Sequence, residues 1–149
     1  MWLYVILFGI LAAAAAMDIK KREISNQICA AVLLLLLPAC LCRPGVSFAD
    51  RIAGGLCVST PMFLISLFRK GAFGGGDIKL TACCGMILGW KITMVSMIFA
   101  VLSGGIWGAG LMVLCGKEKV QDFPFGPFLF LGVMAGVLFG DAFLTWFFA

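Results

Sequence analysis

Long apolar stretches separated by short polar gaps run through the whole chain. Several stretches are shorter than the roughly 20 residues that a perpendicular helix needs to cross about 30 Å of hydrocarbon, and the fourth is the shortest. The pattern predicts an all-α polytopic membrane protein, a bundle of six transmembrane helices that forms a single domain over residues 1–149. The predicted spans are about 2–17, 27–42, 52–68, 78–90, 92–115 and 127–148.

Composition supports this fold class. Hydrophobic residues make up 63% of the chain and charged residues 12%, whereas soluble domains are only about half apolar. The net charge of +4 comes from basic residues scattered over the polar gaps, so nucleic acid is not an expected partner. Most of the seven cysteines lie inside apolar stretches and no paired CxxC elements occur, so the sequence predicts no metal site and no cofactor.

The polar gaps also predict an orientation. Cytoplasmic loops of membrane proteins carry an excess of Lys and Arg. An outward-facing N-terminus satisfies this rule, because three basic residues then lie outside (Arg43, Arg51 and Lys91) and eight lie inside: Lys20, Lys21, Arg22, Arg69, Lys70, Lys79, Lys117 and Lys119.

The first apolar stretch has an alternative interpretation as a cleavable signal peptide. A signal peptide carries its positive charge before the apolar stretch, whereas the basic cluster at 20–22 follows it. We therefore expect 2–17 to be a helix of the mature protein.

Asp18 and Asp77 differ from the other acidic residues, which lie in polar loops or near the outer boundary. The helix before Asp18 rises about 26 Å, which brings this carboxylate to the inner boundary of the bilayer. Asp77 opens the fourth span from the same side, directly after Gly74, Gly75 and Gly76. If the first and fourth helices are neighbours, the two side chains can meet.

Two carboxylates in one low-dielectric site cannot both ionise cheaply, so one keeps a proton. An aspartic protease needs this arrangement, because the ionised carboxylate takes a proton from water while the protonated one supports the developing oxyanion. The chain contains no histidine, which argues against a nucleophilic triad. Hydrolysis here would depend on Asp18, Asp77 and water, with Gly74, Gly75 and Gly76 giving a substrate close access to the backbone.

A structural interpretation stays open beside the catalytic one. The three glycines could form a flexible turn, and Asp77 could cap the N-terminus of the fourth helix. Lys79 could be an anchor at the membrane interface.

The segment "FPFGPFLF", residues 123–130, precedes the last helix and contains Pro124, Gly126 and Pro127. Two prolines and a glycine favour irregular backbone. Such backbone survives at membrane depth only against protein or a water-filled cavity, so the segment is a candidate cavity wall.

Three segments in this order resemble the type IV prepilin peptidases, which are intramembrane aspartyl proteases of the GxGD type. "FGGGDIKL" (73–80) fits the GxGD pattern, "MDIKKREISNQ" (17–27) resembles the family's first catalytic segment, and 123–130 resembles its proline-glycine-proline segment. The resemblance covers nearly the whole chain.

The resemblance implies an aspartic endopeptidase with Asp18 and Asp77 as the catalytic pair. It implies that the substrates are type IV prepilin or pseudopilin precursors, whose short basic leader is cleaved at the cytoplasmic face of the inner membrane. The supporting residues of the three segments are Gly74, Gly75, Gly76, Asn26, Lys79, Pro124, Gly126 and Pro127.

Two departures from the family pattern bear on function. Position 25 is Ser where many relatives have proline, which leaves the register from Asp18 to Asn26 unchanged. The sequence contains no tetracysteine zinc module of the kind found in larger, methylating members, so we expect leader cleavage without N-methyltransferase activity. The alternatives are a small ion-coupled transporter and a non-enzymatic membrane subunit of a pilus or secretion assembly.

Overall fold

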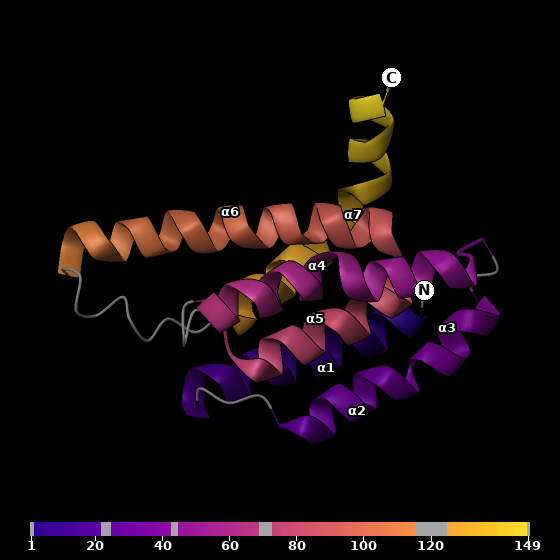
Figure 1. The fold of residues 1–149 in the computed structure, drawn as a ribbon, viewed down its shortest axis with the longest axis horizontal. Helices are drawn as coiled ribbons and strands as arrows, with labels where there is room; N and C mark the ends of the chain where they lie inside the picture. Colours follow the sequence, from indigo (N-terminus) through magenta and orange to yellow (C-terminus); the bar gives the residue numbers. More distant parts are fainter. Residues whose placement is uncertain (1, 22–24, 43–44, 69–72, 116–124, 149) are drawn as a thin grey trace.

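The computed structural model describes residues 2–21, 25–42, 45–68, 73–115 and 125–148, and within these ranges the regular structure is entirely α-helical (Figure 1). This confirms the predicted all-α class. The described helices are α1 (Trp2–Lys21), α2 (Asn26–Leu34), α3 (Leu36–Cys42), α4 (Phe48–Phe68), α5 (Gly75–Leu88), α6 (Trp90–Cys115) and α7 (Gly126–Phe148).

Each of the six predicted apolar stretches coincides with one helix, except the second, which contains both α2 and α3. The break between them falls at Leu35, three residues before Pro38. Proline has no backbone N–H and its ring clashes with the carbonyl four residues earlier, here that of Leu34, so the helix cannot continue regularly through this turn.

Within the described residues, four helices are long and apolar enough to cross a membrane: Trp2–Lys20, Phe48–Phe68, Trp90–Leu114 and Gly126–Trp146. The apolar segment Asn26–Leu41 is shorter, and α5 has only 14 residues, a length of about 21 Å. The chain is therefore a multi-pass membrane protein.

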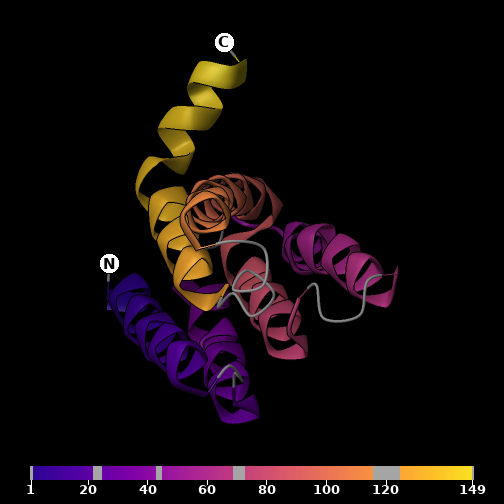
Figure 2. The same cartoon turned by 90° about the vertical axis from the view of Figure 1, so that its left-hand side faces the viewer.

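The helices run alternately in opposite directions, so that their ends gather at two ends of the bundle (Figure 1). α1, α4 and α6 end on the left of this view, where α2, α5 and α7 begin. Figure 2 looks at the bundle from that end, and both views show the last turns of α7 projecting away from the other helices.

The short helix α5 occupies the centre of the bundle. It packs most extensively against α4 and also contacts α2, α3, α6 and α7. Its side chains Leu80, Cys84 and Ile87 are almost completely buried and belong to the main hydrophobic core. Because α5 begins with the segment that contains Asp77, this packing positions that residue.

Glycine allows the closest helix contacts. A Cβ atom on Gly54 of α4 would overlap the carbonyl oxygen of Gly85 on α5, and a Cβ on Gly85 would overlap that of Gly54. On α7, Gly132 and Gly136 lie in the same way against the α6 turn that contains Ser96. Small residues at such crossings let helix backbones approach closely in membrane proteins.

Arg51 is buried inside α4, not in the outer loop where the sequence placed it, because α4 begins at Phe48 rather than at residue 52. Its guanidinium donates hydrogen bonds to the carbonyl oxygens of Ala39 (3.0 Å), Met86 (3.3 Å) and Ile87 (3.5 Å). These carbonyls lie near the C-terminal ends of α3 and α5, where helices leave acceptors unpaired and favour cations. One arginine thus joins three helices.

Candidate active site

Asp18 lies in the last turn of α1 and is 5% exposed. Its Oδ2 atom accepts a hydrogen bond of 2.7 Å from the backbone N–H of Gly126, the first residue of α7. The first N–H groups of a helix have no partner within the helix. Asp18 therefore caps α7 from a different helix, and α1 and α7 pack against each other at this point.

Asp77 lies in the first turn of α5 and is 6% exposed. The backbone N–H of Gly74, the N-cap residue of α5, interacts with its carboxylate. The other carboxylate oxygen, Oδ1, is buried and has no hydrogen-bond partner among the described residues. The N-cap of α5 is thus Gly74 and not Asp77, contrary to the structural interpretation of the sequence, and the interaction with the Gly74 N–H leaves Oδ1 of Asp77 unexplained.

Asp18 and Asp77 lie at the end of α1 and the start of α5, and Figure 2 views the bundle from the end where these two helix ends gather. They are close enough for the negative charge of Asp18 to act on Asp77. The sequence left open whether the first and fourth helices are neighbours. In the structure, α1 packs mainly against α7, whereas α5 packs mainly against α4 and α2. The other helices thus determine how Asp18 and Asp77 face each other.

Asn26 and Lys79 join α2 to α5 beside Asp77. The Lys79 ammonium donates a hydrogen bond of 3.2 Å to Oδ1 of Asn26, the first residue of α2. In the next turn of α2, the Cys29 thiol faces the Gly76 carbonyl with a sulfur–oxygen distance of 4.0 Å. These contacts tie the segment around Asp77 to α2.

An aromatic pair connects the two segments that hold the aspartates. The rings of Phe73 and Phe125 are in edge-to-face contact with centroids 5.5 Å apart. Phe73 precedes the glycines before Asp77, and Phe125 precedes Gly126. Neither this pair nor the hydrogen bond between Asp18 and Gly126 was predicted from the sequence.

The proline-glycine-proline segment is described only in part. Pro124 lies outside the described residues, while Pro127 lies in the first turn of α7. A proline is tolerated there because the N–H that it lacks would have no partner within the helix. Where the sequence predicted a cavity wall, the described part of the segment supplies Gly126 as a donor to Asp18.

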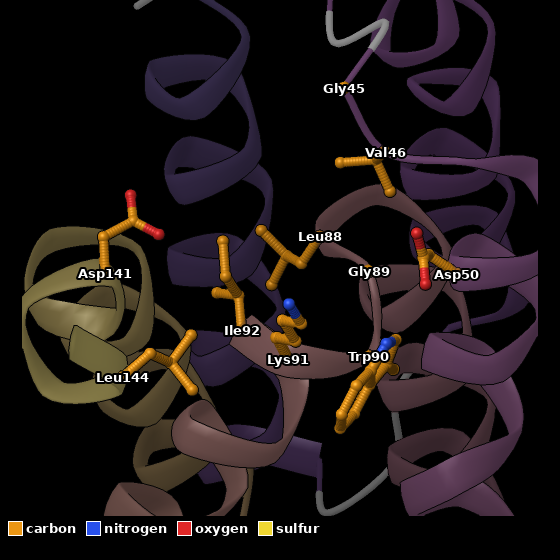
Figure 3. Close-up of a pocket in the computed structure, with 10 residues that line it drawn as sticks. All are labelled: Gly45, Val46, Asp50, Leu88, Gly89, Trp90, Lys91, Ile92, Asp141 and Leu144. Atoms are coloured by element: carbon orange, nitrogen blue, oxygen red, sulfur yellow. The ribbon is translucent and has the colours of Figure 1, made fainter. Parts of the chain in front are cut away.

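The opposite end of the bundle contains a pocket of about 190 Å³ (Figure 3). Its lining combines the start of α6 with the segment before α4 and with α7. Asp50, Lys91 and Asp141 are its charged residues, and neither Asp18 nor Asp77 contributes to it. The sequence expectation that Asp141 lies away from the aspartate pair agrees with this placement.

The fold and the site define a multi-pass helical membrane protein with two buried carboxylates on separate helices at one end of the bundle. The model of the type IV leader peptidase family matches residues 5–109, a range that includes Asp18 and Asp77. The chain belongs to this family, which confirms the resemblance seen in the sequence.

Three relatives illustrate the match, each a protein named prepilin leader peptidase/N-methyltransferase. The protein from Bacillus subtilis (strain 168) is 31% identical over 143 residues, which cover 96% of this chain and 58% of the relative. The protein from Aeromonas salmonicida (strain A449) is 27% identical over 147 residues, 95% of this chain and 50% of the relative. The protein from Legionella pneumophila is 32% identical over 78 residues, 52% of this chain and 27% of the relative.

The chain thus spans 58% and 50% of the length of the first two relatives. No solved structure matches it significantly.

Proposed function

We propose that the chain is a membrane-embedded aspartic endopeptidase that removes the short basic leader from type IV prepilin or pseudopilin precursors. The observation that carries the proposal is the placement of Asp18 and Asp77, both buried, on different helices at the same end of the bundle. Family membership supports the substrate class, since the relatives are named for leader cleavage. The proposal concerns the cleavage step alone.

The reaction needs one water molecule and one proton shared by the two carboxylates. The ionised aspartate takes a proton from water while the water oxygen attacks the carbonyl carbon of the scissile peptide bond. The protonated aspartate gives its proton to the carbonyl oxygen. The tetrahedral diol then collapses: one of its hydroxyl groups returns a proton to the aspartate that gave one, the C–N bond breaks, and the departing nitrogen receives the proton that the other aspartate took from water. The products are a leader with a new carboxylate and a pilin with a new amine.

The proposed orientation puts the N-terminus outside and all six predicted spans across the inner membrane. The ends of α1 and α4 and the start of α5 then face the cytoplasm, and Asp18 and Asp77 lie at that boundary. The excess of basic residues in the gaps on this side supports the orientation. A leader that stays in the cytoplasm would reach the aspartates without crossing the bilayer.

The test is leader removal from a co-expressed candidate prepilin, with wild type compared with Asp18→Asn and Asp77→Asn at equal membrane levels. Both variants are expected to leave the precursor uncleaved, because an amide can neither take the proton nor share it. Glu and Gln are less suitable replacements, since the added methylene would alter buried packing. Full cleavage by either Asn variant would show that its aspartate is structural.

A further inference from the structure

The two carboxylates of the proposed catalytic pair have different surroundings. Asp18 accepts a short hydrogen bond of 2.7 Å from the Gly126 N–H, at the N-terminus of a long helix. Asp77 also faces a backbone N–H, that of Gly74, but its Oδ1 atom is buried without a partner among the described residues. This difference in hydrogen bonding favours the charged form of one carboxylate and the neutral form of the other.

We infer that the pair is asymmetric before substrate binds: Asp18 is the ionised carboxylate that takes the proton from water, Asp77 holds the pair's single proton, and Gly126 is the residue that positions Asp18. This inference rests on the proposed function. It assigns the ionised and the protonated member of the pair and gives Gly126, at the start of α7, a positioning role.

The surroundings of Asp18 favour its charged form. A hydrogen bond from a backbone N–H to a carboxylate is about twice as strong as one between neutral groups. Gly126 is the first residue of α7, so the positive end of this 23-residue helix also faces Oδ2 of Asp18. Both effects disappear if Asp18 is neutral.

The surroundings of Asp77 favour its neutral form. A buried anionic oxygen without a donor costs more free energy than a neutral one, and Oδ1 of Asp77 is such an oxygen. The negative charge of Asp18 acts on Asp77 and adds to this cost. The Gly74 N–H and the N-terminus of α5 favour the charged form of Asp77, but neither donates a hydrogen bond to Oδ1.

Among the residues that the structure describes, none donates a hydrogen bond to Oδ1 of Asp77. The Cys29 thiol of α2 interacts electrostatically with both Lys79 and Asp77 of α5. Lys79 donates to Asn26, which directs its ammonium toward α2. α7 presents a backbone N–H to Asp18 and no charged side chain.

A side chain at position 126 would require Asp18 to move. A Cβ atom there would lie 2.7 Å from Oδ2, 3.0 Å from Cβ and 3.1 Å from Cγ of Asp18. The first two contacts are too close for ordinary packing, so any side chain would push the carboxylate away from its donor. Gly126 thus contributes in two ways: its N–H donates to Asp18, and its lack of a side chain leaves room for the Asp18 carboxylate.

Amide NMR can test the asymmetry without an activity assay. Labelling with [1-13C]phenylalanine and [15N]glycine selects Phe-Gly pairs, and the sequence contains them at 8–9, 73–74, 125–126 and 139–140. Gly126 reports on Asp18 and Gly74 on Asp77, while Gly9 and Gly140 serve as internal controls. The full chain in nanodiscs is the sample, and Asp18→Asn and Asp77→Asn assign the signals.

The inference predicts that the Gly126 amide proton is shifted downfield and loses this shift in Asp18→Asn. The Gly74 amide should move less in Asp77→Asn than the Gly126 amide does in Asp18→Asn, because an amide side chain resembles a neutral carboxyl group more than a carboxylate. The inference is overturned if the Gly74 amide moves as far in Asp77→Asn as the Gly126 amide does in Asp18→Asn, or farther. It is also overturned if Asp18→Asn leaves the Gly126 signal unmoved.

A kinetic test compares Gly126→Ala with Gly105→Ala of α6, where a Cβ meets nothing within 4 Å. Gly126→Ala should reduce kcat about 100-fold with little change in KM, since a misplacement of about 1 Å at the reacting groups has an effect of this size. If both Asn variants are inactive but Gly126→Ala cleaves like Gly105→Ala, the inference fails and the proposed function stands. If the Asn variants cleave, the proposed function itself fails.

Discussion

At the scale of single residues, the hydrogen bond between Lys79 and Asn26 supports the site from outside. It joins exposed side chains at 3.2 Å and holds α2 beside the turn that contains Asp77. A bond of this kind contributes about 0.5–1.5 kcal/mol. Its loss should therefore alter the placement of Asp77 without unfolding the protein.

Lys79→Met is accordingly expected to lower kcat for leader cleavage by about tenfold or less, the equivalent of 1.4 kcal/mol. Lys20→Met, which removes an exposed charge at the end of α1, is the matched control and should cleave like wild type. Complete loss of cleavage in Lys79→Met alone would mean that this ammonium touches the substrate.

Arg51 provides a second prediction at this scale, on stability rather than activity. Arg51→Met leaves the carbonyls of Ala39, Met86 and Ile87 without their donor, and each buried unpaired group costs about 1–3 kcal/mol. We expect a clear fall in the thermal unfolding temperature in detergent. Lys91→Met, which removes an exposed charge near the same end, should change this temperature little.

The sequence predicted the candidate residues better than their contacts. Asp18 and Asp77 stood out because carboxylates are rare in such apolar surroundings and because both fall at one depth. The bond from Gly126 to Asp18 joins residues 108 positions apart, and no local pattern specifies such a pair. The sequence placed Arg51 in an outer loop for a related reason. An arginine next to Asp50 has the same neighbours in the sequence whether it lies in a loop or at the buried end of a helix.

At the scale of helices, the contact between α4 and α5 determines where Asp77 lies. Gly54 and Gly85 face each other so closely that a Cβ atom on either would overlap the partner's backbone. Hydropathy predicted both helices within a few residues, since their apolar stretches are continuous. Hydropathy could not predict which helices touch, because the sequence does not distinguish a glycine at a helix–helix contact from a glycine that faces lipid.

Gly85→Ala should therefore destabilise the protein by about 1–3 kcal/mol through overpacking and should also reduce cleavage, because α5 holds Asp77. The comparison is Gly105→Ala, which adds the same methyl group where space is open and should leave stability equal or slightly higher. Unfolding in detergent and leader cleavage would be measured on the same samples. Unchanged stability in Gly85→Ala would contradict the close packing of α4 on α5.

At the scale of the whole molecule, the proposed orientation makes the two ends of the bundle face opposite sides of the membrane. Ser25, before α2, lies at the end with the aspartates, and Ser47, before α4, lies at the other end. In intact cells, a membrane-impermeant maleimide should label Ser47→Cys directly. It should label Ser25→Cys only after the inner membrane is opened.

The reverse labelling pattern would place the aspartates on the outer side, where a cytoplasmic leader could not reach them. The seven native cysteines require a background in which the accessible ones are replaced first. Cys84 is buried in the core and can remain in that background.

The central claim is that Asp18 and Asp77 of one chain together hydrolyse a leader peptide bond. The most direct measurement uses purified protein in liposomes with a purified prepilin and determines the cleavage products by mass spectrometry. We predict cleavage by wild type, none by Asp18→Asn or Asp77→Asn, and none by an equal mixture of the two variants. Cleavage by either variant, or restored cleavage in the mixture, would contradict a catalytic pair within a single chain.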